Sequence, residues 1–276
     1  MKKRILGLAG ALLCWGTALW AQSDDFGLWT EINVSKSLPH NLELSFEGEY
    51  RMEDCLRKTD RFGGTLSLGY KATKFMKFKA GYALLYGYHS EERKDKYIND
   101  IEDPFYYEGY NLTEAYWSLR HRFKADVTFD KKFFKCLKIS LRERYQYTFR
   151  PEQEVPRLKY RGITDVSTGE PVFYPNPDSP ESDPDVKHEK RTHMLRSRLE
   201  FQYDKKKCDW KPFVSFEVYN DLANQMKTGE YKVMCGTDYK ISKQHKVNVS
   251  YLYNTEMETH PYESRHVLIL GYSYDF

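Results

Sequence analysis

The chain closes with the stretch His266-Val267-Leu268-Ile269-Leu270-Gly271-Tyr272-Ser273-Tyr274-Asp275-Phe276. From Leu268 onward, every second residue is a leucine or an aromatic residue, which is the period-two pattern of a β-strand with one apolar face. The predicted apolar face begins at His266 and carries Leu268, Leu270, Tyr272, Tyr274 and the terminal Phe276. The stretch therefore predicts a long amphipathic strand, and this strand decides the fold class.

Soluble proteins seldom end on such a strand, whereas outer-membrane β-barrels of Gram-negative bacteria commonly do. The resemblance predicts that the apolar face from Leu268 to Phe276 is a barrel-insertion signal, read by the barrel-assembly machinery. It also predicts that the protein lies in the cell outer membrane, with outer-membrane lipids as partners.

The amino-terminal end predicts an exported protein. A basic start over residues 2–4 precedes an apolar run over residues 5–20. This is the pattern of a secretory signal peptide over residues 1–21, cleaved at its end or after Ala18. The run is shorter than the roughly 20 apolar residues that a spanning helix needs. Residues 22–276 are therefore predicted to form the barrel.

The charge of the chain excludes one class of partner. The sequence has 43 Lys and Arg against 40 Asp and Glu. The predicted leader contains three of the basic residues and no acidic one, which leaves 40 of each in the mature chain. Because nucleic-acid binding needs a basic excess, the balance gives no argument for a nucleic-acid partner.

Period-two alternation recurs along the chain and predicts eleven strands. Most of the alternating runs are longer than the roughly 5 to 6 residues usual in soluble strands, and they suit the roughly 9 to 11 residues of a tilted strand that crosses a bilayer. The predicted fold is all-β, a single antiparallel transmembrane barrel of ten to twelve strands. The runs lie at 28–35, 42–51, 62–70, 78–88, 114–123, 137–149, 195–203, 212–218, 231–239, 247–253 and 266–276.

Short and long connections alternate between these runs, as they do on the two sides of outer-membrane barrels. Short polar turns are predicted at 37–41, 71–74, 130–135, 204–209 and 242–244, and longer links at 52–60, 90–109, 151–191, 221–229 and 254–264. Seven of the eleven prolines fall in the link 151–191. Proline has no amide donor and interrupts a β-ladder, so this link is predicted to be a long extracellular loop.

The count of eleven conflicts with the even strand number of single-chain bacterial barrels. A missed strand within 97–110 or 155–174 would give twelve strands. A partial or lumenal strand at 26–36 would give ten. The sequence leaves ten and twelve open.

Four stretches resemble an uncharacterised bacterial family, domain of unknown function 2490. They are 24–30 (DDFGLWT), 44–51 (LSFEGEYR), 141–145 (LRERY) and 195–200 (LRSRLE). The resemblance spans nearly the whole mature chain and implies an outer-membrane barrel. It supplies no catalytic residues.

Charged residues occupy the strand positions opposite the apolar ones. An Arg or Lys facing lipid at mid-depth would cost about 2–4 kcal/mol, so these side chains are predicted to point into the lumen. Six of them are arginines on three consecutive strands. The predicted lumen charge network consists of Glu43, Glu47, Glu49, Arg51, Glu114, Arg120, Arg122, Arg142, Arg144, Arg196, Arg198, Glu200 and Glu217.

Three functions are compatible with such a lumen, and the first is the predicted one. In the first, arginines and carboxylates pair and fill the barrel, which then has a structural or interaction role. In the second, an arginine wall faces a glutamate wall along a narrow pore for small polar solutes. The third, an outer-membrane lipid hydrolase, needs a serine and a histidine as nucleophile and base. The histidines at 188, 193, 260 and 266 form no compact nucleophile motif, so no enzyme is predicted.

The sequence indicates neither a metal site nor a cofactor. The acidic residues 178, 181, 183 and 185 lack the glycine and the terminal glutamate of a calcium-binding EF-hand loop. Cys55, Cys136, Cys208 and Cys235 contain no Cys-x-x-Cys pair. A bridge between Cys136 and Cys208 would have to span about 10 Å, because one strand separates their own strands. The ligand and the oligomeric state are not indicated.

Overall fold

A computed structural model describes residues 25–276, except 98–106, 166, 174–179, 207 and 258–262. The predicted leader lies outside the described residues. Among the described residues, no helix is long and apolar enough to cross a membrane. All regular elements that the structure describes are β-strands.

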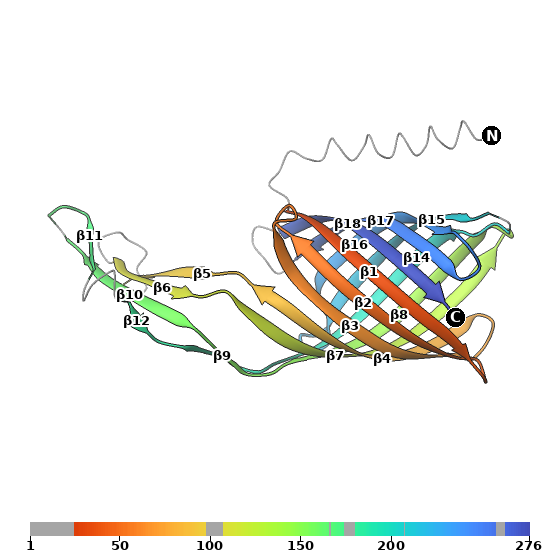
Figure 1. The fold of residues 1–276 in the computed structure, drawn as a ribbon, viewed down its shortest axis with the longest axis horizontal. Helices are drawn as coiled ribbons and strands as arrows, with labels where there is room; N and C mark the ends of the chain where they lie inside the picture. The colour runs from red at the N-terminus through yellow and green to blue at the C-terminus, as the bar shows by residue number, and fades with distance from the viewer. Residues whose placement is uncertain (1–24, 98–106, 166, 174–179, 207, 258–262) are drawn as a thin grey trace, which may run out of the picture.

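Eleven of the strands form a closed barrel, drawn as the tilted arrows of Figure 1. They are 12 to 18 residues long, and nearly all neighbours around the wall are antiparallel. This confirms the predicted all-β barrel. In order around the wall they are β1 (Asp25–Leu38), β18 (Glu263–Asp275), β17 (His245–Glu256), β16 (Lys227–Lys240), β15 (Trp210–Asp221), β14 (Lys190–Tyr203), β8 (Leu137–Arg150), β7 (Tyr116–Phe133), β4 (Met76–His89), β3 (Lys58–Lys71) and β2 (Leu42–Glu53).

The barrel closes through one parallel pair, which resolves the conflict over strand number. β1 pairs in parallel with β18, from Asp25 beside Arg265 to Ser35 beside Asp275. An odd number of strands joined by antiparallel hairpins must bring the first and last strands together in the same direction. The even number expected from other bacterial barrels is therefore wrong here, and β1 is a full strand of the wall.

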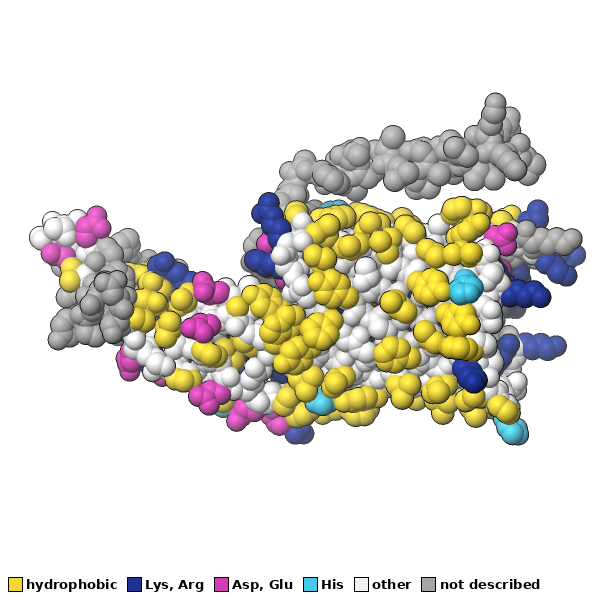
Figure 2. Space-filling model, viewed as in Figure 1, with side chains coloured by type: hydrophobic (Ala, Val, Ile, Leu, Met, Phe, Trp, Pro, Cys, Tyr) yellow, Lys and Arg dark blue, Asp and Glu magenta, His cyan; other side chains and the backbone are white. Residues whose placement is uncertain are grey.

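The strand pattern gives the wall two different faces. Large apolar side chains point outward, as at Phe46 (51% exposed), Leu66 (55%) and Phe216 (48%), and they cover the visible outside of the barrel in Figure 2. Between them, small polar residues such as Ser45 and Ser215 point inward and are buried. The predicted insertion residues at 268, 270, 272, 274 and 276 share the outward face.

The two ends of the barrel differ in their connections. The short-turn end carries the hairpin turns after β1, β3, β7, β14 and β16, together with the end of β18. At His40 and Asn41 both φ angles are 61°, in the left-handed region, within the three-residue turn 39–41 that joins Leu38 to Leu42. The long-link end carries the remaining connections. Two links predicted to be long are short turns, 54–57 and 222–226, because the flanking strands extend further than their alternating cores.

An arm of short strands extends from the long-link end (Figure 1). The two long connections of the barrel supply it, and β6 pairs with β10 across them. The link 151–191 is therefore not free of strands, and the segments considered as missed wall strands belong to this separate sheet. The arm strands are β5 (Glu92–Tyr97), β6 (Tyr107–Thr113), β9 (Gln153–Val155), β10 (Arg157–Thr164), β11 (Pro171–Phe173), β12 (Glu181–Ser182) and β13 (Asp185–Lys187).

Candidate functional site: the charged lumen

The barrel encloses a cavity of about 820 Å³. A barrel of about eight strands is just wide enough for side chains to fill it, so a wall of eleven strands leaves space that its side chains do not fill. The cavity is lined mainly by charged and amide side chains, with a small apolar group formed by Trp29, Leu252 and Ile269.

Most residues of the predicted lumen network line this cavity. They are Glu47, Glu49, Arg51, Arg120, Arg122, Arg142, Arg144, Arg196, Arg198, Glu200 and Glu217. Two residues do not. Glu43 lies on the same face of β2 but at the short-turn end, where it is exposed, and Glu114 precedes the start of β7 and lies outside the wall.

Several charged lining residues were missed in the sequence. Lys124 continues the inward face of Arg120 and Arg122, one residue beyond the predicted alternating run 114–123. Arg61 falls between the predicted link 52–60 and the predicted run 62–70. The other missed lining residues are Glu31, Glu53, Asp60, Glu230, Lys232, Asp238, Glu256 and Arg265. Period two extended by a few residues at each strand end would have found Lys124 and Arg61.

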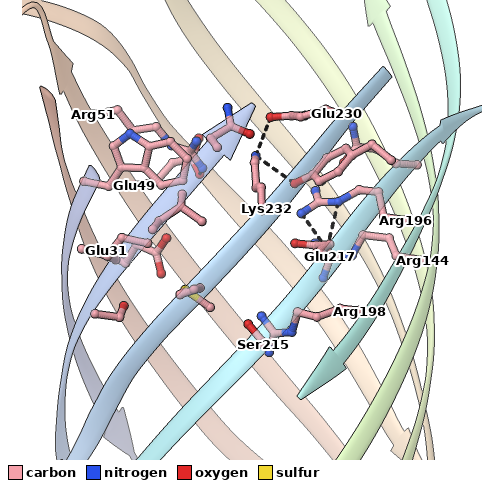
Figure 3. Close-up of a pocket in the computed structure, with 18 of the residues that line it drawn as sticks. Glu31, Glu49, Arg51, Arg144, Arg196, Arg198, Ser215, Glu217, Glu230 and Lys232 are labelled. Carbon is pink, nitrogen blue, oxygen red and sulfur yellow. Dashed lines mark hydrogen bonds and ion pairs between the residues drawn. The ribbon is translucent and has the colours of Figure 1, made fainter. Parts of the chain in front are cut away.

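Glu217 on β15 is the centre of one ion-pair cluster (Figure 3). Its Oε1 accepts hydrogen bonds from Arg142 Nη2 at 2.7 Å and from Arg196 Nη2 at 3.1 Å. Its side chain is only 9% exposed. Because Arg142 lies on β8 and Arg196 on β14, the carboxylate joins three neighbouring strands of the wall.

A second cluster surrounds Glu49 on β2. Glu49 pairs with Arg51 on its own strand and with Arg61 on β3, both at 3.0 Å. The Arg51 guanidinium lies 3.6 Å above the ring of Trp29 on β1. This cluster and the Glu217 cluster lie on opposite sides of the view in Figure 3.

The ion pairs run along the wall and do not cross the lumen. Arg144 pairs with Asp126 on the adjacent strand, and Arg198 with Glu200 on its own strand. Among the described residues, each ion pair inside the barrel joins residues on one strand or on strands at most two places apart around the wall. The network therefore lines the cavity and leaves its centre open.

A second cavity of about 220 Å³ lies at the short-turn end. It shares two lining residues, Gln202 and Asp238, with the large cavity. Asp238 accepts hydrogen bonds from Gln202 at 3.0 Å and from Asn248 at 2.9 Å. These three side chains, called here the Asp238 bridge, stand where the two cavities meet.

Other chemistries find less support in the described part of the chain. The structure joins His89 Nε2 to Ser118 Oγ at 2.9 Å, but Ser118 is 2% exposed and neither residue lines the large cavity. His188 contacts Glu152, and His193 contacts Tyr145. No group of three or more His, Cys, Asp or Glu within the described ranges could hold a metal ion. All four described cysteines are free thiols.

The sequence profile of one family, described as protein of unknown function (DUF2490), matches residues 26–265. The chain belongs to this family. No curated protein sequence matches it. Among solved structures, this DUF2490 protein is similar to the beta domain of the Bordetella autotransporter BrkA, at 11% identity, with 88% of this chain and 86% of that chain covered and a TM-score of 0.48. It is also similar to the translocator domain of the autotransporter NalP from Neisseria meningitidis, at 12% identity, with 99% and 96% covered and a TM-score of 0.33.

Proposed function

We propose that this DUF2490 protein is an integral outer-membrane β-barrel through which small polar solutes pass. The observation that carries the proposal is the pair of cavities, about 820 and 220 Å³, which lie in series and meet at the Asp238 bridge. Together they run from the interior of the barrel to its short-turn end. Ion pairs that follow the wall keep this route polar without filling it.

The outer surface supports insertion into a membrane. Large apolar and aromatic side chains dominate the outward face, as expected where a strand meets lipid on one side and a polar interior on the other. A closed wall also leaves no unpaired strand edge, which a bilayer would penalise. Basic side chains, Lys or Arg, gather at the short-turn end, where they would contact water and lipid headgroups (Figure 2).

Conductance across a planar bilayer tests the passage. Refolded protein is expected to give discrete conductance steps, and Asp238→Ala is expected to give larger ones because it removes the side chain between the two cavities. Asp209→Ala is the matched control, because Asp209 lines only the small cavity. Folding of each sample is checked by its altered gel mobility before boiling.

An absence of steps from correctly folded protein would overturn the passage. The structural or interaction role would then remain, and the arm, which leaves the barrel with its own sheet, favours it. We propose that the protein has no enzymatic role. Release of fatty acid from phospholipid and lipopolysaccharide vesicles by the folded protein would contradict this proposal.

A further inference from the structure

The inward face of β7 carries three cations that have no carboxylate partner. Arg120 donates to His89 Nε2 at 3.2 Å, and Arg122 donates to Thr148 Oγ1 at 3.3 Å. Lys124 donates to Thr65 Oγ1 at 3.2 Å. All three line the large cavity, yet the structure gives none of them an ion pair within 4.0 Å. Buried charges are usually paired, so these three differ from the neighbouring arginines of β8 and β14.

The surroundings of Arg122 are mainly positive. The charges that act on it most strongly are those of Arg61, Arg196, Glu49 and Arg51, three of them cations. The single carboxylate, Glu49, is already paired with Arg51 and Arg61. Arg196 is paired with Glu217, so the excess positive charge near Arg122 comes from Arg122 itself and from Arg51 and Arg61, which share one carboxylate.

Lys124 has acidic neighbours at longer range. Glu47 acts on it most strongly and Glu49 less so, but no ion pair joins Lys124 to either of them. Beside Arg122 and Lys124 the inward residues of β3 and β4 are small: Thr65, Ser67, Gly81 and Ala83. At Gly81 an added Cβ would lie 2.4 Å from Ser67 Oγ, so glycine is needed where these two strands approach. The small residues leave space in front of Lys124.

Unsatisfied donors occur in the same wall. The Nε atoms of Arg51 and Arg142 are buried and have no hydrogen-bond partner. Arginine guanidinium groups bind carboxylate and phosphate oxygens with good geometry, often through two donors at once. Donors of this kind beside unpaired cations are suited to an oxyanion.

The small cavity supplies an entrance of the same sign. Lys211, Lys240, Lys243 and Lys246 line it, together with Asp209, Asp238 and Asp275. Asp238 keeps its negative charge, because its two donors in the bridge are neutral amides, so the mouth has four lysines against three carboxylates. A lysine-rich mouth raises the local concentration of anions and speeds their entry.

We propose that Arg122 and Lys124 form a subsite for an oxyanion group, phosphate or carboxylate, on the solute that the barrel admits. Arg120 extends this subsite toward the long-link end. The inference rests on the proposed passage and gives its substrate class. The β7 cations are left free of carboxylates so that the solute supplies the counter-charge.

The reversal potential in a gradient of potassium chloride measures the selectivity of the lumen. The wild-type protein is expected to be anion-selective, and inorganic phosphate is expected to block the chloride current. In the double variant Arg122→Gln and Lys124→Gln, the reversal potential moves toward cation selectivity. Block by phosphate weakens about tenfold, the effect of losing roughly 1.4 kcal/mol of binding free energy.

Two control variants separate the subsite from net charge. Lys131→Gln removes a charge from the same strand, but its side chain points outward over Phe133, so selectivity is expected to be unchanged. Arg122→Lys keeps the charge and is expected to keep most of the selectivity. Equal effects of the double variant and of Lys131→Gln would contradict the subsite.

The outcomes separate the subsite from the passage. Steps without anion selectivity and without phosphate block overturn the subsite and leave the passage standing. If folded protein gives no steps, the passage fails, and thermal unfolding with added phosphate decides the subsite. Stabilisation of the wild type that is lost in the double variant supports an anion-binding barrel, because a ligand that binds only the folded state raises its stability. Equal stabilisation of both, or none, overturns the subsite.

Discussion

The barrel wall and the arm are both built from β-strands, but different interactions hold them. Wall strands are 12 to 18 residues long and each has neighbours on both sides, whereas arm strands are 2 to 8 residues long. Ion pairs deep in the lumen are largely buried, as at Glu217 with 9% exposure of its side chain. Arm pairs are more exposed, as at Asp183 with 30%. The same kind of contact should therefore matter more in the wall.

The largest expected effect is at Glu217. The substitution Glu217→Gln leaves Arg142 and Arg196 without their carboxylate inside the wall, and breaking a buried pair costs about 3–5 kcal/mol. The free energy of unfolding, measured by urea titration in lipid vesicles, should fall by this amount. In the arm, Asp183→Asn removes pairs to Arg157 and Lys159 and should have a much smaller effect, because exposed ion pairs contribute little to stability. Equal losses of unfolding free energy in the Glu217 and Asp183 variants would contradict the distinction between the wall and the arm.

A charge on the outer face should have the next largest effect. Leu270 is 39% exposed and points outward from β18. In a bilayer, Leu270→Arg should destabilise the folded barrel by about 2–4 kcal/mol, because it places a cation against lipid. The control is Val172→Arg in the arm, which is 44% exposed and should be close to neutral. The measurement is the same titration in lipid vesicles, and a neutral Leu270→Arg would contradict lipid contact on this face.

Gly109 in β6 tests whether the arm unfolds separately from the wall. Its φ angle is +126°, and an added Cβ would lie 2.1 Å from the carbonyl oxygen of Tyr160. The variant Gly109→Ala should break the pairing of β6 with β10 at a local cost of about 1–3 kcal/mol. Limited proteolysis should cut the arm faster while the barrel stays resistant. Gly169→Ala, at a positive φ with open space around it, is the milder control.

The smallest effect is the pH response of the arm. Hydrogen bonds from Lys159, then Arg157, hold the pKa of Asp183 below its ordinary value. Because the folded pKa is lowered, this stabilisation is complete above about pH 4 and is lost as the pH falls through the folded pKa. Hydrogen exchange in β10 should therefore quicken at low pH. A matching response in the Asp183→Asn variant would assign the effect to another group.

The sequence predicts the strands of the wall more fully than those of the arm. Period two located all eleven wall strands and placed six arginines inward, because one buried polar face repeats along each long strand. The strand number was still misjudged, since the pattern within a strand does not reveal that β1 closes onto β18 in parallel. The arm was missed because β6 and β10 are short and pair over a separation of about fifty residues in sequence. Strands this short contain too few alternating residues for a period-two pattern to be recognised.

Most of the charged residues that line the lumen could also be predicted, whereas the ion pairs between them could not. Alternation identified Arg120 and Arg122 as inward residues, but it does not say which inward charges meet. Arg142 pairs with Glu217, which lies two strands away around the wall, whereas Arg122 donates a hydrogen bond to the hydroxyl of Thr148. That difference depends on the stagger between strands, which the spacing within one strand does not show.

The central claim is that the wall has lipid outside and water inside, and Phe46 and Glu47 on β2 test it most directly. Phe46 is 51% exposed on the outside, and Glu47 lines the cavity. After replacement of the native cysteines, Phe46→Cys and Glu47→Cys are reconstituted into lipid vesicles and treated with a charged, water-soluble thiol reagent. Rapid labelling of Glu47→Cys and protection of Phe46→Cys are expected. Faster labelling of Phe46→Cys, as its greater exposure in water alone would give, would contradict it.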